Sequence, residues 1–309
     1  MNRLVCVRND HKLCILDADS GEVIRIVNIA DSLFGPVRLS VRFSCCRDGH
    51  HLIASCAAII SIWKTNFDSS LDLSRTYSCP HLIFCVCVND VDSHFVTGHE
   101  YGFLYYWDTE SGELLWSRNV HDGQTVRTVD ISLDGALIVS GGYDDLVRIC
   151  SAKIGEQIYQ CLGHTQSIYS LQFSPDISRM ASGSYDKTVR IWDVASQAQV
   201  MLLEGHTGCV TSLSYSYDGT RLATGSHDNV VMIWDVETGD CLWVLRGHTK
   251  LVRSVSFNSD ASRLVSGGGD KRIIIWDCVT GCEIQRIESS SPSVTSVRYL
   301  PAVSDYLLK

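Results

Sequence analysis

Histidine, serine and aspartate recur in this chain at a spacing that could support hydrolytic chemistry. His164, Ser182 and Asp186 are the side-chain types of a nucleophilic triad, in which a histidine takes the proton of a serine hydroxyl and an aspartate orients the histidine. The same types return at the same spacing in two later sets, His206, Thr224 and Asp228, and His248, Ser266 and Asp270. An enzyme needs only one triad, so three copies in succession favour a structural role.

Each set lies in one copy of an internal repeat. The copies read SGSYDKTVRIWDV, TGSHDNVVMIWDV and SGGGDKRIIIWDC, and their tryptophans, Trp192, Trp234 and Trp276, are 42 residues apart. A Gly-His pair stands 28 residues before each tryptophan. A repeat of about 40–45 residues with these signatures is typical of a four-stranded propeller blade, which buries its faces only against neighbouring blades.

The chain resembles the WD-repeat β-propeller family, closely over residues 120–288 and in phase elsewhere. Counting back from Trp192, the equivalent position holds Cys150, Trp107, Trp63 and Leu16. Seven such positions imply an all-β fold, a seven-bladed propeller of four-stranded antiparallel blades, with strands a to d running from the central channel to the rim. Short alternating or apolar runs separated by Asp-Gly, Thr-Gly or Ser-Gly turns favour such strands.

The two ends of the chain predict how the ring closes. The sequence begins with an expected strand b at 4–7 and ends just after an expected strand a at 294–300, so the C-terminal strand should complete the first blade. We therefore expect one domain over residues 1–309, with blade 1 formed by 1–30 and 293–300. The other blades are expected at about 36–80, 81–119, 120–162, 163–204, 205–246 and 247–288.

The resemblance also assigns the repeated polar residues. In the family, the histidine, hydroxyl and aspartate of a blade form a structural tetrad with its tryptophan, which here implies tetrads ending at Trp192, Trp234 and Trp276 and no catalytic residues. Two further blades match this pattern in part. Blade 4 has His121, Ser140 and Asp144 but Cys150 for tryptophan, and blade 3 has Thr97 and Trp107 but Ser78 and Tyr101 in the histidine and aspartate positions.

Two positions in each blade are expected to point towards the top face, which carries the d–a loops and the b–c turns. One follows the first apolar residue of strand a, and the other precedes the aspartate of the b–c turn. Tyrosine and arginine are enriched at binding hot spots, and folding does not require them at these positions. The residues that we expect to bind a partner are Phe84, Arg127, Tyr143, Tyr169, Tyr185, His227 and Arg253. The equivalent positions in other blades include Asn9 and Leu39.

These features favour a non-enzymatic scaffold that holds partner proteins or peptides on its top face during complex assembly. The alternative is a substrate-recognition subunit of a ubiquitin ligase or signalling complex. The arginine and tyrosine positions resemble those of the phosphodegron-reading propellers of F-box proteins, where arginines neutralise a phosphate. However, Arg127 and Arg253 lie three blades apart, which argues against their sharing one phosphate. An enzyme would need a lone, non-repeating set of acid, base or metal ligands, and the sequence contains none.

Composition narrows the class of partner. The net charge is −9 and there is no Lys/Arg run, so direct nucleic-acid binding is disfavoured. No phosphate-binding glycine loop or zinc-helix motif occurs, so we expect no cofactor and no metal. The most apolar short run has strand length, so we expect neither a signal peptide nor a membrane span. Fourteen cysteines, mostly in strand-like runs, favour reduced thiols and a cytoplasmic or nuclear protein. We also expect the propeller to be monomeric.

Overall fold

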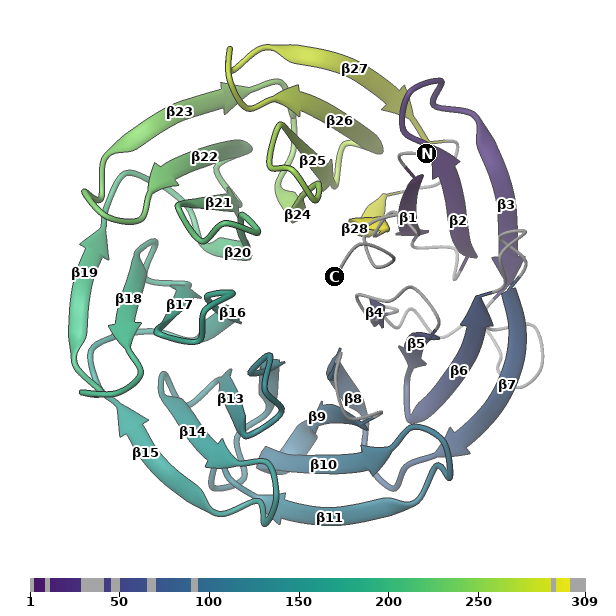
Figure 1. The fold of residues 1–309 in the computed structure, drawn as a ribbon, viewed down its shortest axis with the longest axis vertical. Helices are drawn as coiled ribbons and strands as arrows, with labels where there is room; N and C mark the ends of the chain where they lie inside the picture. The colour runs from purple at the N-terminus through teal and green to yellow at the C-terminus, as the bar shows by residue number, and fades with distance from the viewer. Residues whose placement is uncertain are drawn as a thin grey trace.

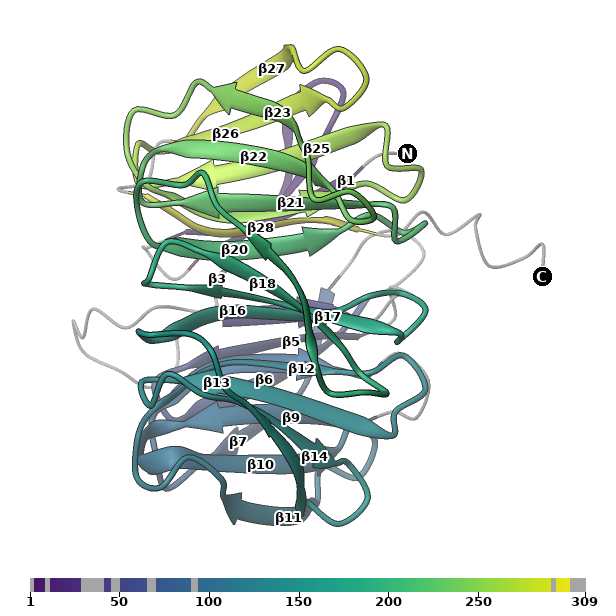
Figure 2. The same ribbon diagram turned by 90° about the vertical axis from the view of Figure 1, so that its left-hand side faces the viewer.

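Seven four-stranded antiparallel sheets surround a central channel in the computed structural model (Figure 1). The structure describes residues 3–8, 12–28, 42–45, 51–65, 71–89, 94–289 and 293–300. In each sheet the innermost strand lines the channel and the outermost lies at the rim (Figure 1). Figure 2 shows the same ring from its side. The predicted all-β, seven-bladed propeller is therefore confirmed.

The strands follow one another from the channel outward. Blade 1 contains β28 (Val294–Leu300), β1 (Arg3–Arg8), β2 (Lys12–Asp17) and β3 (Val23–Asn28). Blades 2 to 4 contain β4 (Arg42–Cys45), β5 (His51–Cys56), β6 (Ile59–Thr65) and β7 (Leu71–Ser78); β8 (Ile83–Val88), β9 (His94–His99), β10 (Phe103–Asp108) and β11 (Leu114–Asn119); and β12 (Val126–Ile131), β13 (Leu137–Gly142), β14 (Val147–Ser151) and β15 (Gln157–Cys161). A short 3-10 helix, η1 (Glu100–Gly102), joins β9 to β10.

The remaining blades have the same order. Blades 5 to 7 contain β16 (Ile168–Phe173), β17 (Arg179–Ser184), β18 (Val189–Asp193) and β19 (Gln199–Leu203); β20 (Val210–Tyr215), β21 (Arg221–Ser226), β22 (Val230–Asp235) and β23 (Cys241–Arg246); and β24 (Val252–Phe257), β25 (Arg263–Gly268), β26 (Arg272–Asp277) and β27 (Glu283–Glu288).

The two ends of the chain close the ring within blade 1. Strand β28 pairs antiparallel with β1 in a register that places Val5 opposite Arg298. Figure 1 shows the yellow β28 beside the purple β1. The Thr295 hydroxyl donates to the Val7 carbonyl at 2.9 Å. The predicted closure is confirmed, and its physical value is that it leaves no inner strand unpaired at the seam.

The hydrophobic core lies between adjacent blades. One cluster packs Ala181 and Ile191 of blade 5 against Val210, Leu222 and Trp234 of blade 6. Glycines in the second strand of several blades allow this close approach. A Cβ on Gly183, for example, would lie 2.7 Å from Val210 Cγ1, so this position excludes a side chain.

Side chains of the inner strands also join blades 4 to 7 to one another. Phe173 N–H donates to Asp130 Oδ2 at 2.7 Å, and Tyr215 N–H donates to Gln172 Oε1 at 2.7 Å. Phe257 N–H continues the series to Ser214 Oγ at 3.2 Å. These bonds fix the inner strands to one another and so fix the spacing of the residues around the channel.

The sequence analysis also made predictions about cysteines, metal ligands and membrane spans. Eight of the twelve cysteines that the structure describes are buried, and all twelve are free thiols. Burial raises the pKa of the Cys150 thiol to about 12. In the described ranges, no cluster of three or more potential metal ligands occurs. No helix in the same ranges is long and apolar enough to cross a membrane.

Candidate partner-binding face

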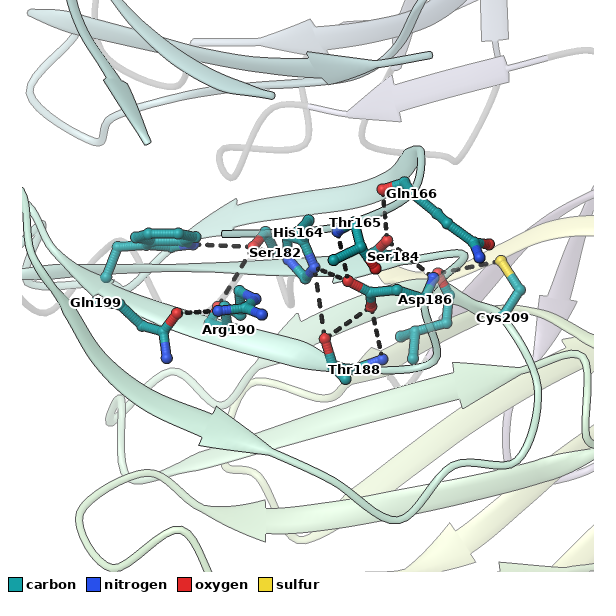
Figure 3. Close-up of polar contacts among 12 residues, drawn as sticks. His164, Thr165, Gln166, Ser182, Ser184, Asp186, Thr188, Arg190, Gln199 and Cys209 are labelled. Carbon is teal, nitrogen blue, oxygen red and sulfur yellow. Dashed lines mark hydrogen bonds and ion pairs between the residues drawn. The ribbon is translucent and has the colours of Figure 1, made fainter. Parts of the chain in front are cut away.

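The triad-like residues of blade 5 form a buried hydrogen-bonded chain (Figure 3). His164 comes from the loop before β16, Ser182 from β17 and Asp186 from the turn after β17. His164 Nδ1–H donates to Asp186 Oδ2 at 2.7 Å, and the Ser182 hydroxyl lies 2.7 Å from His164 Nε2. Trp192 Nε1–H donates to Ser182 Oγ at 2.9 Å. Ser182 is 0% exposed, and the chain of bonds ties the loop before β16 to β17 and to the turn that follows it.

Blades 6 and 7 repeat this geometry. His206 Nε2 lies 2.7 Å from the Thr224 hydroxyl, and His206 Nδ1 lies 2.8 Å from Asp228 Oδ2. The equivalent distances in blade 7, from His248 to Ser266 and Asp270, are 2.8 Å and 2.9 Å. The indoles of Trp234 and Trp276 donate to the hydroxyls at 3.0 Å and 2.8 Å.

The carboxylate of the blade 6 set is held in its charged form. Burial alone would raise the pKa of Asp228. The hydrogen bond and charge of His206, with the N–H groups of Thr207 and Val230, outweigh burial and lower that pKa to about 2. Since the favourable contacts exist only in the folded state, this carboxylate stabilises the fold at neutral pH.

Blade 3 has a related network although the sequence places Ser78 and Tyr101 at the histidine and aspartate positions. His99, on the strand β9, takes the role of the histidine. Trp107 Nε1–H donates to Thr97 Oγ1 at 3.0 Å, and Thr97 Oγ1 lies 2.7 Å from His99 Nε2. His99 Nδ1–H donates to the His81 carbonyl at 3.3 Å, so a backbone oxygen replaces the aspartate. Burial lowers the pKa of His99 to about 4.

Blade 4 lacks the tryptophan, and an arginine joins its network at the histidine and the aspartate. His121 Nε2 lies 2.8 Å from Ser140 Oγ, and His121 Nδ1 lies 2.9 Å from Asp144. Arg148, which pairs with Ser140 across β13 and β14, adds a short ion pair with Asp144, and its NH1 atom lies 2.7 Å from His121 Nδ1. The Arg148 side chain is only 4% exposed, so it is a buried charge in a polar network. In the sequence, Arg148 could have been found as the charged residue of the third strand that pairs with the tetrad hydroxyl of the second strand.

Arg127 lies at the centre of an aromatic group on the top face. It extends from β12, and its Cζ atom lies 4.9 Å from the ring centre of Tyr169 and 5.7 Å from those of Phe84 and Tyr143. The rings of Tyr143 and Tyr169 are 6.5 Å apart, and those of Tyr169 and Tyr185 are 6.1 Å apart. The structure therefore brings five of the seven residues expected to bind a partner into one patch, which spans blades 3 to 5 and is called here the aromatic patch.

Arg253 and His227 lie on the other side of the channel mouth, in blades 7 and 6. Burial and the positive charge of Arg127, three blades away, lower the pKa of Arg253. Burial and the charge of Arg253 lower the pKa of His227. Asn9 and Leu39, which were expected at the same level, lie outside the described residues.

The channel below the mouth is a cavity of about 330 Å³. Its wall includes Arg127, Tyr169 and Arg253 near the top and Asp130 and Arg298 further along the inner strands. The sequence analysis did not single out Asp130 or Arg298. Their signal is positional, because each stands three residues after the top-face position of its strand.

Comparison with known proteins gives several partial matches. The nuclear distribution protein PAC1 of Komagataella phaffii is 27% identical over 117 residues, which are 37% of this chain and 23% of that protein. The peroxisomal targeting signal 2 receptor of Mus musculus is 29% identical over 132 residues, covering 42% of this chain and 41% of the receptor. The cilia- and flagella-associated protein 52 of Mus musculus is 25% identical over 91 residues, which are 29% of this chain and 15% of that protein. The chain spans less than half the length of each of these relatives.

A family model gives the wider match. The WD domain, G-beta repeat, matches residues 112–151, 155–193, 197–235 and 239–277, together just over half of the chain. These four segments include the three complete tetrads and the strands of blade 4 that carry Arg148. Propellers of this kind are typically non-catalytic interaction modules. On the repeats, the seven-bladed ring and this match, the chain belongs to the WD-repeat β-propeller family.

Proposed function

We propose that this propeller is a non-enzymatic scaffold that holds a partner protein or peptide on its top face during the assembly of a complex. The observation that supports this function best is the aromatic patch around Arg127. Three rings surround the Arg127 guanidinium at the mouth of the channel. Among the described residues, no tetrad and no hydrogen bond between blades uses this guanidinium.

The exposure of this patch fits a binding surface. Tyr143 and Tyr185 are 42% and 50% exposed, while their rings pack beside Tyr169. A tyrosine that is held in place loses little conformational freedom on binding, and it offers both apolar area and a hydroxyl. A few such anchors, rather than a large contact area, supply most of the binding energy of protein interfaces.

The relatives support a general interaction role without choosing a pathway. One of them is named as a receptor for a peroxisomal targeting signal, and the others are named for nuclear distribution and for cilia and flagella. We therefore propose a protein or peptide partner, and a cytoplasmic or nuclear location where the free thiols stay reduced.

The second candidate is a substrate-recognition subunit of a ubiquitin ligase or signalling complex. The specific observation in its favour is that Arg127 and Arg253 both line the channel. Two arginines at one mouth could bind the same phosphate, which is the chemistry of a phosphopeptide reader.

Affinity capture from cell lysate followed by mass spectrometry tests the proposed function. The bait is the wild-type chain beside a Tyr143→Ala/Tyr185→Ala variant, and the matched control is Tyr217→Ala, because Tyr217 is 41% exposed in the turn between β20 and β21 on the opposite face. We expect the top-face variant to lose proteins that the control retains. Capture of ubiquitin-ligase subunits would favour the second candidate, and identical protein sets from all three baits would contradict both.

A further inference from the structure

The turn between β13 and β14 in blade 4 carries Tyr143, an exposed ring of the aromatic patch. Asp144 and Asp145 follow this tyrosine directly. Tyr143 is 42% exposed, and its backbone N–H donates to the Thr125 carbonyl at 3.1 Å. Because much of the side chain lies in solvent, its place in the patch depends on how firmly this b–c turn is held.

In blades 5 to 7 a backbone hydrogen bond holds the equivalent turn. The residue that follows the tetrad histidine donates its N–H group to the aspartate of the turn. These bonds join Thr165 to Asp186 at 3.2 Å, Thr207 to Asp228 at 2.9 Å and Thr249 to Asp270 at 3.0 Å. Figure 3 shows the bond of blade 5. Each of these blades thus fastens its d–a loop to its b–c turn through the main chain of the loop.

Blade 4 fastens the same loop and turn through a side chain. Asp122 follows the histidine here, and within the described residues its N–H group forms no bond with Asp144. Instead, Arg148 NH2 lies 3.1 Å from Asp122 Oδ2, and Arg148 NH1 forms a short ion pair with Asp144 Oδ2. The forked guanidinium can hold two carboxylates at once, so it bridges the loop and the turn.

The fold of a blade does not require an arginine at this position. The equivalent residues, which also pair with the tetrad hydroxyl, are Arg190, Met232 and Ile274 in blades 5 to 7. Arg190 donates to Gln199, and the other two carry no charge. Among these four blades only blade 4 has the bridge, and it also supplies both Arg127 and Tyr143 to the aromatic patch. A local exception to the repeat is expected where a site serves function rather than folding.

The two arms of the bridge differ in burial. The side chains of Arg148 and Asp144 are 4% and 11% exposed, whereas that of Asp122 is 88% exposed. Asp144 also accepts from His121 Nδ1 at 2.9 Å, so it keeps a partner when the Asp122 arm is lost. An exposed ion pair adds little to the stability of the whole fold. Loss of the Asp122 arm should therefore loosen the loop and the turn without unfolding the blade.

We propose that Arg148 is a positioning residue of the top face. By bridging Asp122 and Asp144 it holds the turn of Tyr143 in the conformation that a partner contacts. A binding residue that is fixed before binding loses less conformational entropy in the complex. Arg148 itself is buried, so it acts through Tyr143 and does not touch the partner. This inference rests on the proposed function, and it adds what keeps the binding face ready.

Hydrogen–deuterium exchange of the full chain, followed by mass spectrometry, tests whether the bridge holds the turn. The variants are Arg148→Met, with the residue type that blade 6 has at this position, and Asp122→Asn, since asparagine tolerates the left-handed backbone there (φ 47°). The matched control is Arg190→Met. We expect the amides of residues 143–146 to exchange about tenfold faster in Arg148→Met and about threefold faster in Asp122→Asn, and those of 185–188 to be unchanged in the control.

Affinity capture tests whether this hold serves partner binding. Both variants should capture about threefold less of the proteins that Tyr143→Ala/Tyr185→Ala loses, and Arg190→Met should capture as much of them as the wild-type chain does. Circular dichroism and the melting temperature check that each variant is folded. Asp122→Asn changes an exposed side chain, so it decides the question if Arg148→Met does not fold.

Three results would overturn the inference. They are unchanged exchange of residues 143–146 in both variants, a rise in exchange that is equal in all blades and so indicates a purely structural role, and faster exchange of the turn with undiminished capture. The proposed function would survive each of them if Tyr143→Ala/Tyr185→Ala still lost partners. If that double variant loses none, the proposed function fails and the inference fails with it, so the two failures are distinguishable.

Discussion

Blades 5 to 7 and blades 3 and 4 solve the same structural problem with different chemistry. In blades 5 to 7 an indole, a hydroxyl, an imidazole and a carboxylate form one repeated chain of bonds. Blade 3 keeps the indole, the hydroxyl and the imidazole, but its histidine comes from β9 and its final acceptor is a backbone carbonyl. Blade 4 keeps the hydroxyl, the imidazole and the carboxylate, and Arg148 joins the network.

The shared element in all five blades is the pair of hydroxyl and imidazole. The groups at the two ends of the pair can be exchanged, provided that each buried polar atom still has a partner. This is the expected behaviour of a buried network, because an unpaired group costs about 1–3 kcal/mol whereas one partner can substitute for another. The complete tetrad is therefore one of several ways to satisfy the same buried atoms.

The largest expected difference between the two regions comes from Arg148 and its counterpart Arg190. Arg148→Ala should lower the free energy of unfolding by about 3 kcal/mol, because it removes one partner of a buried ion pair. Arg190→Ala in blade 5 is the matched control. It should lower the free energy of unfolding by about 1 kcal/mol or less, because Arg190 donates a hydrogen bond to the exposed Gln199 side chain. Urea unfolding of both variants measures the difference. Equal losses would show that Arg148 does not belong to the network.

The second difference concerns pH. His99 has a folded pKa of about 4, below the usual value of 6.5, because burial disfavours its charged form. Between about pH 4 and pH 6.5 the unfolded chain therefore binds more protons than the folded chain. The free energy of unfolding is unaffected by His99 above about pH 6.5, and it falls by roughly 2–3 kcal/mol as the pH drops towards 4. In blade 6, Asp228 has its pKa lowered to about 2, so its contribution is present above about pH 4 and is lost only at lower pH.

Urea unfolding between pH 7 and pH 4 checks this prediction. The wild-type chain should lose stability over that range by more than a His99→Gln variant does, because glutamine does not titrate. Parallel curves for the two proteins would mean that the buried histidine of blade 3 contributes no pH dependence.

The smallest expected effect comes from removing the imidazole of a complete tetrad. His206→Ala removes the hydrogen bonds of the imidazole with the Thr224 hydroxyl and with Asp228 Oδ2, and it should lower the free energy of unfolding by about 2 kcal/mol. Asp228 keeps the N–H groups of Thr207 and Val230, which limits the loss. Differential scanning calorimetry measures the change, and an unchanged melting temperature would argue that this tetrad is not needed for stability.

The sequence predicted the ring and its closure because both depend on a strict repeat. The tryptophan spacing fixed the number of blades, and an unpaired strand at each end of the chain predicted the pairing of β28 with β1. The sequence did not identify His99, because the repeat placed the histidine in a loop. Thr97 and His99 are two residues apart on one strand and so share a face, which is the rule that could have found it.

The geometry of the channel mouth also needed three dimensions. The positions of Arg127, Tyr169 and Arg253 follow from the repeat, but the reach of an arginine side chain does not. Sequence reasoning placed Arg127 and Arg253 three blades apart, and the structure shows that both line the same channel cavity.

Site-specific photo-crosslinking tests most directly the claim that partners bind the top face. A photoreactive phenylalanine analogue replaces Tyr143 on the top face or Tyr217 on the opposite face, two positions with similar exposure of 42% and 41%. After irradiation in cells, we predict crosslinked partner proteins from position 143 and few or none from position 217. Crosslinks from position 217 alone would contradict the claim and would assign partner binding to the opposite face.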